Sequence, residues 1–208
     1  MRIILSDSDI TPDRPHKDYN LDLWGTTADT NVLWITGISG SGKSTLAEYI
    51  AAKTDADIIH IDFYTFDDPD DYADEMSSDF NQYLDEHLLD WRDIQRSAAG
   101  GGSEAGMWFD TLEAAIKAYG AELFEVRKVI AEGVQLLDET LFYNNKQALC
   151  DQPVIVMTTS LKDSVHGIIY RDQMDLDTYL HSGKYRQLQR FDTYKTDLLD
   201  VLGGNTLL

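Results

Sequence analysis

Cysteine is almost absent from this sequence of 208 residues, which contains only Cys150. One thiol cannot form a disulfide within the chain, and without a secretory context it suggests a reducing compartment. The sequence also lacks any run of about eighteen apolar residues, so we expect no membrane-spanning helix. The apolar stretch that follows Met1 is too short for a signal peptide. These absences predict a soluble, cytoplasmic protein.

Basic residues are scarce as well. The chain has 17 Lys and Arg against 37 Asp and Glu, which gives a formal net charge of -20 at pH 7. Because such a charge repels polyanions, it argues against a general affinity for nucleic acid or an anionic membrane, although a local basic cleft stays compatible with it. Hydrophobic residues make up 43% of the sequence, which is enough for the core of one α/β domain.

A glycine-rich segment stands between a strand pattern and a helix pattern. Residues 31–36 read Asn-Val-Leu-Trp-Ile-Thr, a β-branched and aromatic run that is typical of a buried strand. Helical spacing of apolar residues follows from Ser44 onward. Between them the P-loop pattern G-x-x-x-x-G-K-S is complete, in the sequence Gly37-Ile38-Ser39-Gly40-Ser41-Gly42-Lys43-Ser44-Thr45. This context makes a chance match the weaker interpretation.

The residue types of this loop suit the binding of phosphates. Glycines let successive backbone N–H groups point inward at phosphate oxygens, and the helix that starts near Lys43 adds the positive end of its dipole. Lys43 would reach the β- and γ-phosphates, and the Ser44 hydroxyl would take a Mg²⁺ position. We therefore predict that the phosphates of a nucleoside triphosphate bind to Gly37, Ser39, Gly40, Ser41, Gly42, Lys43, Ser44 and Thr45.

The rest of the chain alternates strand and helix patterns. Alternation of this kind predicts an α/β fold with a mostly parallel sheet that is covered on both faces. Further strands are predicted at residues 57–61, 128–131 and 154–158. Further helices are predicted at residues 79–95, 109–121, 161–172 and 177–201.

Several motifs in combination resemble one family. The chain resembles the P-loop kinase group, nearest to small kinases of the uridine-kinase and zeta-toxin-like type. The resemblance covers about residues 31 to 190 and implies a three-layer P-loop NTPase fold with a mostly parallel central sheet and a helical lid. The motifs that carry it are the P-loop, Ile61-Asp62-Phe63-Tyr64, the segment from Ile130 to Leu137, and Tyr170-Arg171-Asp172.

The resemblance implies a chemistry and a set of roles. ATP would donate its γ-phosphate to a hydroxyl of a small molecule, with nucleosides among the candidate acceptors and Mg²⁺ as the counterion. Asp62 would orient the acceptor hydroxyl and take its proton, and Glu132 would hold Mg²⁺ together with Ser44. Arg171 in the lid, with Lys43, would stabilise the charge on the transferring group.

The resemblance also implies a domain organisation. Residues 1–30 are an N-terminal extension, in which the apolar run at residues 2–5 is a candidate edge strand. Residues 31–208 are the P-loop kinase domain. Within it, residues 67–127 are predicted as a helical insertion on the acceptor side, and residues 160–200 as the lid and the C-terminal helices.

Each candidate residue also has a purely structural interpretation. Asp62 would then cap a turn, Glu132 would be a solvated acid at a strand end, and Arg171 would be a solvated surface arginine. This interpretation weighs more for Arg186 and Arg190, which lie four residues apart on one face of the last predicted helix.

Other features are interpreted as structural or leave a choice open. His60, inside a predicted strand, is interpreted as a core residue. The acidic stretch at residues 67–90 is interpreted mainly as a solvated face, which makes a poor dock for a phosphorylated acceptor. No strand pattern follows the lid, which leaves the choice between ATP and GTP open, and the oligomeric state is not determined by the sequence.

Two other functions remain open at this point. A kinase that acts on a hydroxyl of a nucleic acid or a nucleotide sugar would favour a basic groove, and the net charge of -20 speaks against it. A non-kinase P-loop ATPase would instead switch the conformation of a partner. An Asp62 remote from the γ-phosphate would favour that switch.

Overall fold

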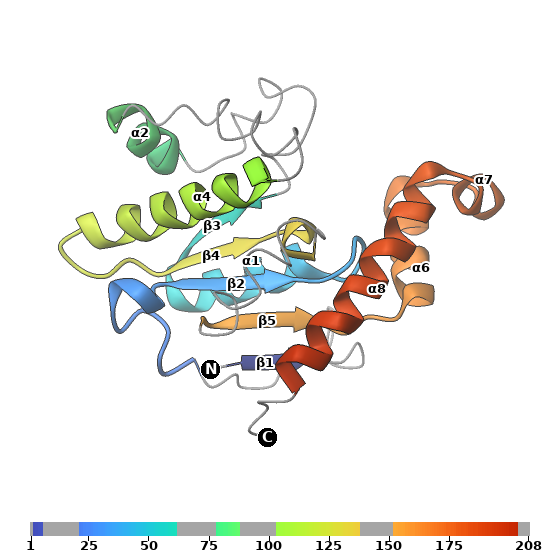
Figure 1. Ribbon diagram of the computed structural model, residues 1–208, viewed down its shortest axis with the longest axis horizontal. Coiled ribbons are helices and arrows are strands. Elements are labelled where there is room, and N and C mark those ends of the chain that lie inside the picture. The colour runs from blue at the N-terminus through green and yellow to red at the C-terminus, as the bar shows by residue number, and fades with distance from the viewer. Residues whose placement is uncertain (1, 6–20, 62–77, 88–102, 138–151, 204–208) are drawn as a thin grey trace.

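A computed structural model describes residues 2–5, 21–61, 78–87, 103–137 and 152–203 of the chain. The strands of this part form one five-stranded sheet in the order β1-β5-β2-β4-β3, and every pairing in it is parallel (Figure 1). The strands are β1 (Arg2–Leu5), β2 (Val32–Thr36), β3 (Asp57–His60), β4 (Val129–Glu132) and β5 (Val154–Met157).

Helices connect the strands and lie on both faces of this sheet (Figure 1). Parallel neighbours require such crossover connections, because a tight turn can join only antiparallel strands. The helices are α1 (Lys43–Thr54), α2 (Ser78–Glu86), α4 (Ser103–Glu122), α6 (Leu161–Asp172), α7 (Leu176–Leu180) and α8 (Gly183–Gly203), and short 3-10 helices are η2 (Ala28–Thr30) and η6 (Val134–Leu137).

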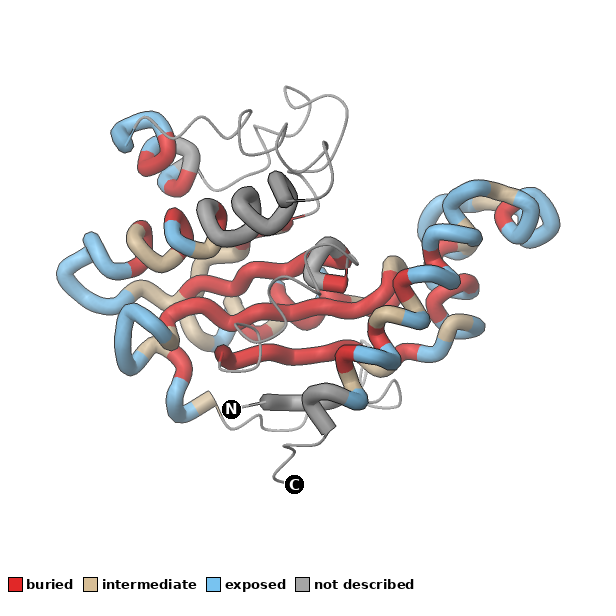
Figure 2. The backbone as a smooth tube through the Cα atoms, in the orientation of Figure 1, coloured by how far each residue is buried: buried red, intermediate tan, exposed pale blue. Residues whose placement is uncertain are grey.

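The central strand β2 supplies both halves of the core. All five of its residues are buried (Figure 2). Successive side chains of a strand point to opposite faces, so Leu33 packs with Leu46 of α1 in one cluster, whereas Trp34 packs with Ile116 of α4 and Leu198 of α8 in the other. This two-sided core confirms the predicted three-layer α/β fold with a parallel central sheet.

The apolar run at residues 2–5 forms the edge strand β1. It pairs in parallel with β5, with Ile3 opposite Ile155. The sheet position that lies next to β5 is thus filled from the N-terminal end of the chain.

Helix α6 has the predicted bounds because its ends are encoded locally. The Ser160 hydroxyl accepts a hydrogen bond from the Asp163 backbone N–H and donates to the Asp163 carboxylate, which caps the first turn. Gln173 takes the left-handed conformation at the other end, with φ 51°.

The C-terminal helical region differs from the prediction. Residues 177–201 were expected to form one helix, but α7 ends at Leu180 and α8 begins at Gly183. The Ser182 hydroxyl accepts a hydrogen bond from the Tyr185 backbone N–H, at 3.2 Å, so this serine caps a new helix and breaks the predicted one.

Other predicted boundaries shift as well, most of them by one residue. Strand β3 ends at His60, one residue before the predicted end, and α4 begins at Ser103, six residues before the predicted start. Helix α2 is described over Ser78–Glu86, and the predicted continuation from residue 88 to 95 lies outside the described residues.

A cluster at the amino end of the sheet fixes α4 against β3. The Arg127 guanidinium forms an ion pair with Asp57 at 2.5 Å, and the Tyr119 hydroxyl donates to the same carboxylate at 3.0 Å. Burial and the Asp57 charge raise the pKa of Tyr119 above its ordinary value, so the phenol stays protonated. This cluster lies at the opposite end of the strands from the P-loop.

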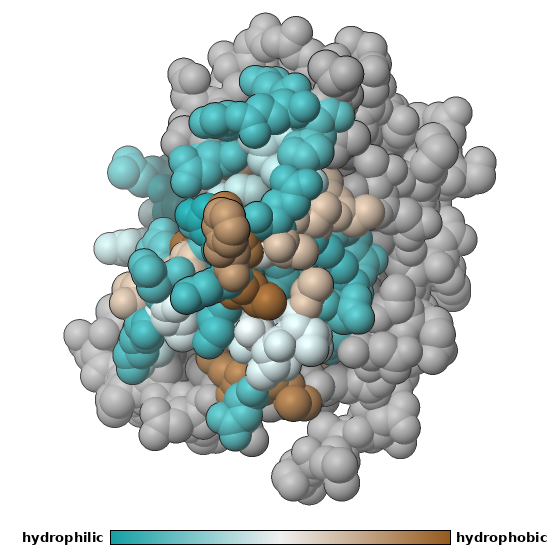
Figure 3. Space-filling view, turned by 90° about the vertical axis from the view of Figure 1, so that its left-hand side faces the viewer, coloured by the Kyte–Doolittle hydropathy of each residue, from teal (hydrophilic) through white to brown (hydrophobic). Residues whose placement is uncertain are grey.

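The same end carries exposed apolar side chains. Leu123, Phe124 and Val126 of the α4–β4 connection are exposed, as is Leu23. Among the described residues of the face shown in Figure 3, brown side chains protrude among teal ones. No helix in the described part of the chain is long and apolar enough to cross a membrane.

Candidate functional site

The P-loop joins the end of β2 to the start of α1, at the carboxyl edge of the sheet. All three of its glycines have positive φ: Gly37 has φ 152°, whereas Gly40 at 78° and Gly42 at 85° adopt the left-handed conformation. A side chain is disfavoured in this conformation, which explains glycine at both positions. Gly42 is the N-cap of α1. The helix therefore presents its free N–H groups and the positive end of its dipole at the loop.

Lys43, the first residue of α1, is folded back over the loop. Its side chain is buried, and its ammonium group donates a long hydrogen bond of 3.4 Å to the Ile38 carbonyl. A buried ammonium group is costly unless negative charge or strong acceptors compensate it. Lys43 therefore adds positive charge at the point where the backbone turns around the loop.

A buried carboxylate completes this edge of the sheet. Glu132, the last residue of β4, is 2% exposed. Its Oε1 atom accepts a hydrogen bond from the Ser44 hydroxyl at 3.0 Å and lies 2.6 Å from the His60 Nδ1 atom. The structure thus brings together Ser44 and Glu132, the two residues predicted to hold Mg²⁺.

His60 is not the core residue that the sequence suggested. It is the last residue of β3, at an edge of the sheet, and its side chain is 24% exposed. The Ile59 and Ile61 neighbours are buried, which explains the wrong interpretation, because alternation along a strand turns the intervening residue to the other face.

The electrostatic surroundings keep Glu132 ionised. Burial raises the pKa of this carboxyl group, but the hydrogen bond from His60, the charge of Lys43 and the hydrogen bond from Ser44 together outweigh burial and lower the pKa below its ordinary value. A negative charge therefore sits under the start of α1 at neutral pH.

Four of the six buried side-chain polar atoms that have no hydrogen-bond partner in the described part of the chain lie at the same edge, and the other two belong to Asn31 at the opposite end of β2. The four are Ser41 Oγ in the loop, Glu132 Oε2, Thr158 Oγ1 just after β5, and Ser164 Oγ in the turn of α6 that meets the loop. Buried polar atoms in folded proteins are nearly always paired. A set of them around a phosphate-type loop is consistent with a polar ligand at this site.

Helix α6 packs directly on the loop. A Cβ atom added to Gly40 would lie 2.6 Å from the Ser164 backbone oxygen, and one added to Gly167 would lie 3.0 Å from the Gly40 oxygen. Small residues on both sides therefore allow the backbone of α6 to approach the backbone of the loop.

We expect Gly40→Ala to weaken nucleotide binding about tenfold and to lower the free energy of unfolding by about 1–3 kcal/mol, because the new methyl group meets backbone and the φ of 78° is strained. Titration with a fluorescent ATP analogue and urea unfolding would measure both effects. Gly183→Ala is the matched control, since nothing lies within 4 Å of its added Cβ. Equal behaviour of the two variants would contradict the packing argument.

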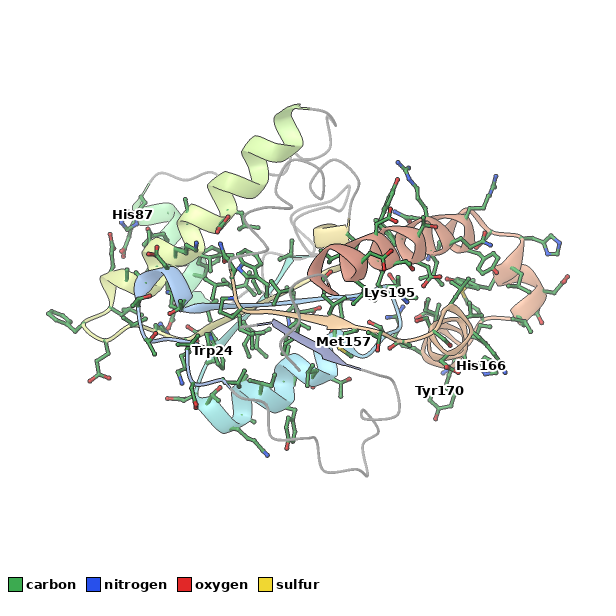
Figure 4. All side chains as sticks on the ribbon, turned by 60° about the horizontal axis from the view of Figure 1, so that its bottom comes forward. Trp24, His87, Met157, His166, Tyr170 and Lys195 are labelled. Atoms are coloured by element: carbon green, nitrogen blue, oxygen red, sulfur yellow. The ribbon has the colours of Figure 1, made fainter. Side chains whose placement is uncertain are left out.

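A second connection links α8 to the loop. The Lys195 ammonium donates to the Thr159 carbonyl at 2.7 Å and pairs with Asp192 at 2.7 Å, and the Thr159 hydroxyl donates to the Ser41 carbonyl at 3.2 Å. Lys195 is buried where α8 passes the end of β5 (Figure 4). The sequence showed Lys195 only as one base of a helical tail, and its Asp192 partner three residues earlier was the available signal.

Arg171 and Arg190 contact residues of their own helices. Arg171 pairs with Asp172 at 2.6 Å, lowering the pKa of that carboxyl group, and its side chain is 66% exposed. Arg190 donates to the Tyr194 hydroxyl at 2.7 Å, and Arg186 is exposed. The lid role of Arg171 stays a prediction, and the sequence assigned no role to Arg186 and Arg190.

Asp62, the predicted partner of the acceptor hydroxyl, lies outside the described residues. The same is true of the acidic stretch from residue 67 to 77. The acceptor side of the site therefore stays a prediction, as does the binding of phosphates to the loop.

Comparisons with known proteins connect part of the chain to one family model. The model described as Nephrocystin 3, N-terminal, matches residues 16–99, a segment that contains the P-loop. This match does not assign the chain to a kinase family. No curated protein matches significantly. Among solved structures, "Crystal structure of TT1252 from Thermus thermophilus" is 17% identical, with 85% of this chain and 98% of that chain covered and a TM-score of 0.36. A likeness this weak carries no conclusion about function.

Proposed function

We propose that this chain is an ATP-dependent phosphotransferase that moves the γ-phosphate to a hydroxyl of a small molecule, with nucleosides among the candidates. The observation that carries the proposal is the contact between Ser44, at the start of the helix after the P-loop, and the buried Glu132 at the end of β4. The two residues lie 88 positions apart in the sequence, and the fold brings them to the edge where parallel α/β sheets bind ligands.

The loop supports binding of the triphosphate. Its left-handed glycines, the free N–H groups at the start of α1 and the Lys43 ammonium group all favour an anion at one place. The net charge of -20 makes such a local positive site more selective, because the rest of the surface repels anions.

Ser44 and Glu132 fit a bound Mg²⁺. Both offer oxygen, the ligand type that this ion prefers, and Glu132 is ionised and keeps Oε2 without a hydrogen-bond partner in the described structure. When bound, the ion would neutralise charge on the phosphates of the nucleotide.

The chain's own groups would act mainly by positioning and charge stabilisation. Lys43 and the start of α1 would hold the γ-phosphate and stabilise the charge that spreads over it during transfer. Asp62 is proposed to hold the acceptor hydroxyl in line and to receive its proton, and Arg171 to approach as a lid residue.

The contacts between the loop and helices α6 and α8 favour a second candidate. Helix α6 contacts Gly40, and Lys195 connects α8 to Thr159 and, through it, to Ser41. Binding of a ligand in the loop would therefore change the positions of these helices. The alternative is an ATPase switch whose output is a movement of α6 and α8 against a partner.

A turnover assay separates the two candidates. ATP consumption would be followed with Mg²⁺, with and without a panel of nucleosides and other hydroxyl compounds, for the native protein, Asp62→Asn and the exposed control Asp85→Asn. We expect turnover that requires an acceptor and falls about a hundredfold in Asp62→Asn only. Acceptor-independent hydrolysis that Asp62→Asn leaves unchanged would instead support the switch.

A further inference from the structure

His60 and Glu132 are neighbours because of strand register. β3 and β4 pair in parallel, and His60 lies opposite Glu132 at the last pair of the ladder. Side chains at paired positions leave a sheet on the same face. The two residues are 72 positions apart in the sequence, so only this pairing brings the imidazole to the carboxylate.

The contacts distinguish the two oxygens of Glu132. Oε1 is close to both His60 Nδ1, at 2.6 Å, and Ser44 Oγ, at 3.0 Å. Oε2 is buried and has no hydrogen-bond partner in the described structure. An ionised carboxylate only accepts hydrogen bonds, so Nδ1 is the protonated nitrogen of His60 in this contact.

The hydrogen bond from His60 Nδ1 restricts the orientation of the Glu132 carboxylate more than the hydrogen bond from Ser44 does alone. The Ser44 hydroxyl can rotate, and the proposed function gives it a second task at the ion. The imidazole is planar, so its N–H has no rotation of its own, and the strand register holds the His60 backbone opposite Glu132. With Oε1 held from this side, Oε2 is the oxygen left to face a ligand.

We propose that His60 is a positioning residue, which holds Glu132 Oε1 so that Oε2 faces the nucleotide-bound Mg²⁺. This inference rests on the proposed function, because it assigns His60 a role in the same site. His60 touches neither phosphate nor acceptor in this role and acts only through Glu132. Partners of this kind typically contribute ten- to a hundredfold to metal affinity.

Equilibrium binding without turnover tests the inference. A fluorescent, non-hydrolysable ATP analogue would be titrated with Mg²⁺ and, separately, in EDTA, for the native protein and four variants. The variants are His60→Leu, His60→Asn, His60→Gln and the exposed control His166→Leu, whose position on α6 is labelled in Figure 4.

We expect His60→Leu to raise the half-saturating Mg²⁺ concentration about ten- to a hundredfold and to change analogue binding in EDTA by less than about twofold. His60→Asn should restore Mg²⁺ dependence to within about threefold of native, because its amide N–H₂ group occupies roughly the place of Nδ1. His60→Gln carries its amide group one methylene farther from the backbone, so it should not restore the Mg²⁺ dependence. The contrast between Asn and Gln holds even if the leucine variant fails to fold.

The outcomes separate the inference from the function on which it rests. A native protein that responds to Mg²⁺ while His60→Gln and His60→Asn titrate alike would overturn the role of His60 alone. A native protein that binds the analogue neither with Mg²⁺ nor in EDTA would overturn the proposed function, and the inference with it.

Discussion

Replacing Lys43 by methionine is expected to lower acceptor-dependent ATP turnover about a hundred- to a thousandfold. Within the described part of the chain, the buried ammonium group donates a long hydrogen bond of 3.4 Å to the Ile38 carbonyl and acts on the Glu132 charge, and a phosphate oxygen would be a stronger partner. In a site of low dielectric constant, removing such a charge costs far more than it would in water. Initial rates at saturating and limiting ATP measure the loss.

The control for this change is Lys53→Met, on the same helix. Lys53 is exposed and contacts the Tyr49 hydroxyl near the far end of α1, so its loss should leave turnover within about twofold. Methionine keeps the aliphatic stem of Lys43 in the core, and thermal unfolding of the two variants should therefore be similar without ligand. If Lys43→Met turned over ATP as fast as the native protein, the proposed role of the P-loop in phosphoryl transfer would be wrong.

The second large effect is expected for Glu132→Gln. This change keeps the shape of the side chain but removes the charge that Lys43, His60 and Ser44 surround. We expect Mg²⁺-dependent turnover to fall about a hundredfold or more, and the stabilisation that Mg²⁺ adds to that by ATP to disappear. A ligand at a hundred times its Kd stabilises by about 2.7 kcal/mol, so thermal unfolding with ATP alone and with Mg²⁺-ATP reports this loss directly.

Glu125→Gln is the matched control, because Glu125 is exposed in the connection before β4. Its ligand-induced stabilisation should equal that of the native protein. If Glu132→Gln kept the full stabilisation by Mg²⁺-ATP, Glu132 would be only a structural partner of His60 and Ser44.

The part of the site that could be predicted from residue patterns alone is contiguous, whereas the pairing of Ser44 with Glu132 was expected only from the resemblance. The P-loop requires glycines at defined positions and a helix that starts at Lys43. Both features are encoded in the nine consecutive residues 37–45, so they can be recognised without the tertiary structure. Helix α6 was predicted with the right bounds for the same reason, since Ser160 and Asp163 cap it within one turn.

The errors have different physical causes. His60 was interpreted as a core residue because buried isoleucines flank it, but an edge position and the register with β4 turn it toward Glu132. The last predicted helix was wrong because a single capping serine, Ser182, outweighed a continuous helical pattern. For Lys195 the sequence offered only its nearby partner Asp192, because its other partner, Thr159, is 36 residues away.

The sequence by itself determined the α/β class, the P-loop and the helix that follows it, because these depend on short-range backbone preferences and on hydrophobic periodicity. Only the tertiary structure decided the strand order β1-β5-β2-β4-β3 and the meeting of Ser44, His60 and Glu132. The physical reason is that strand pairing is non-local: the same strand patterns fit several orders, and the packing of both faces of the sheet selects one of them.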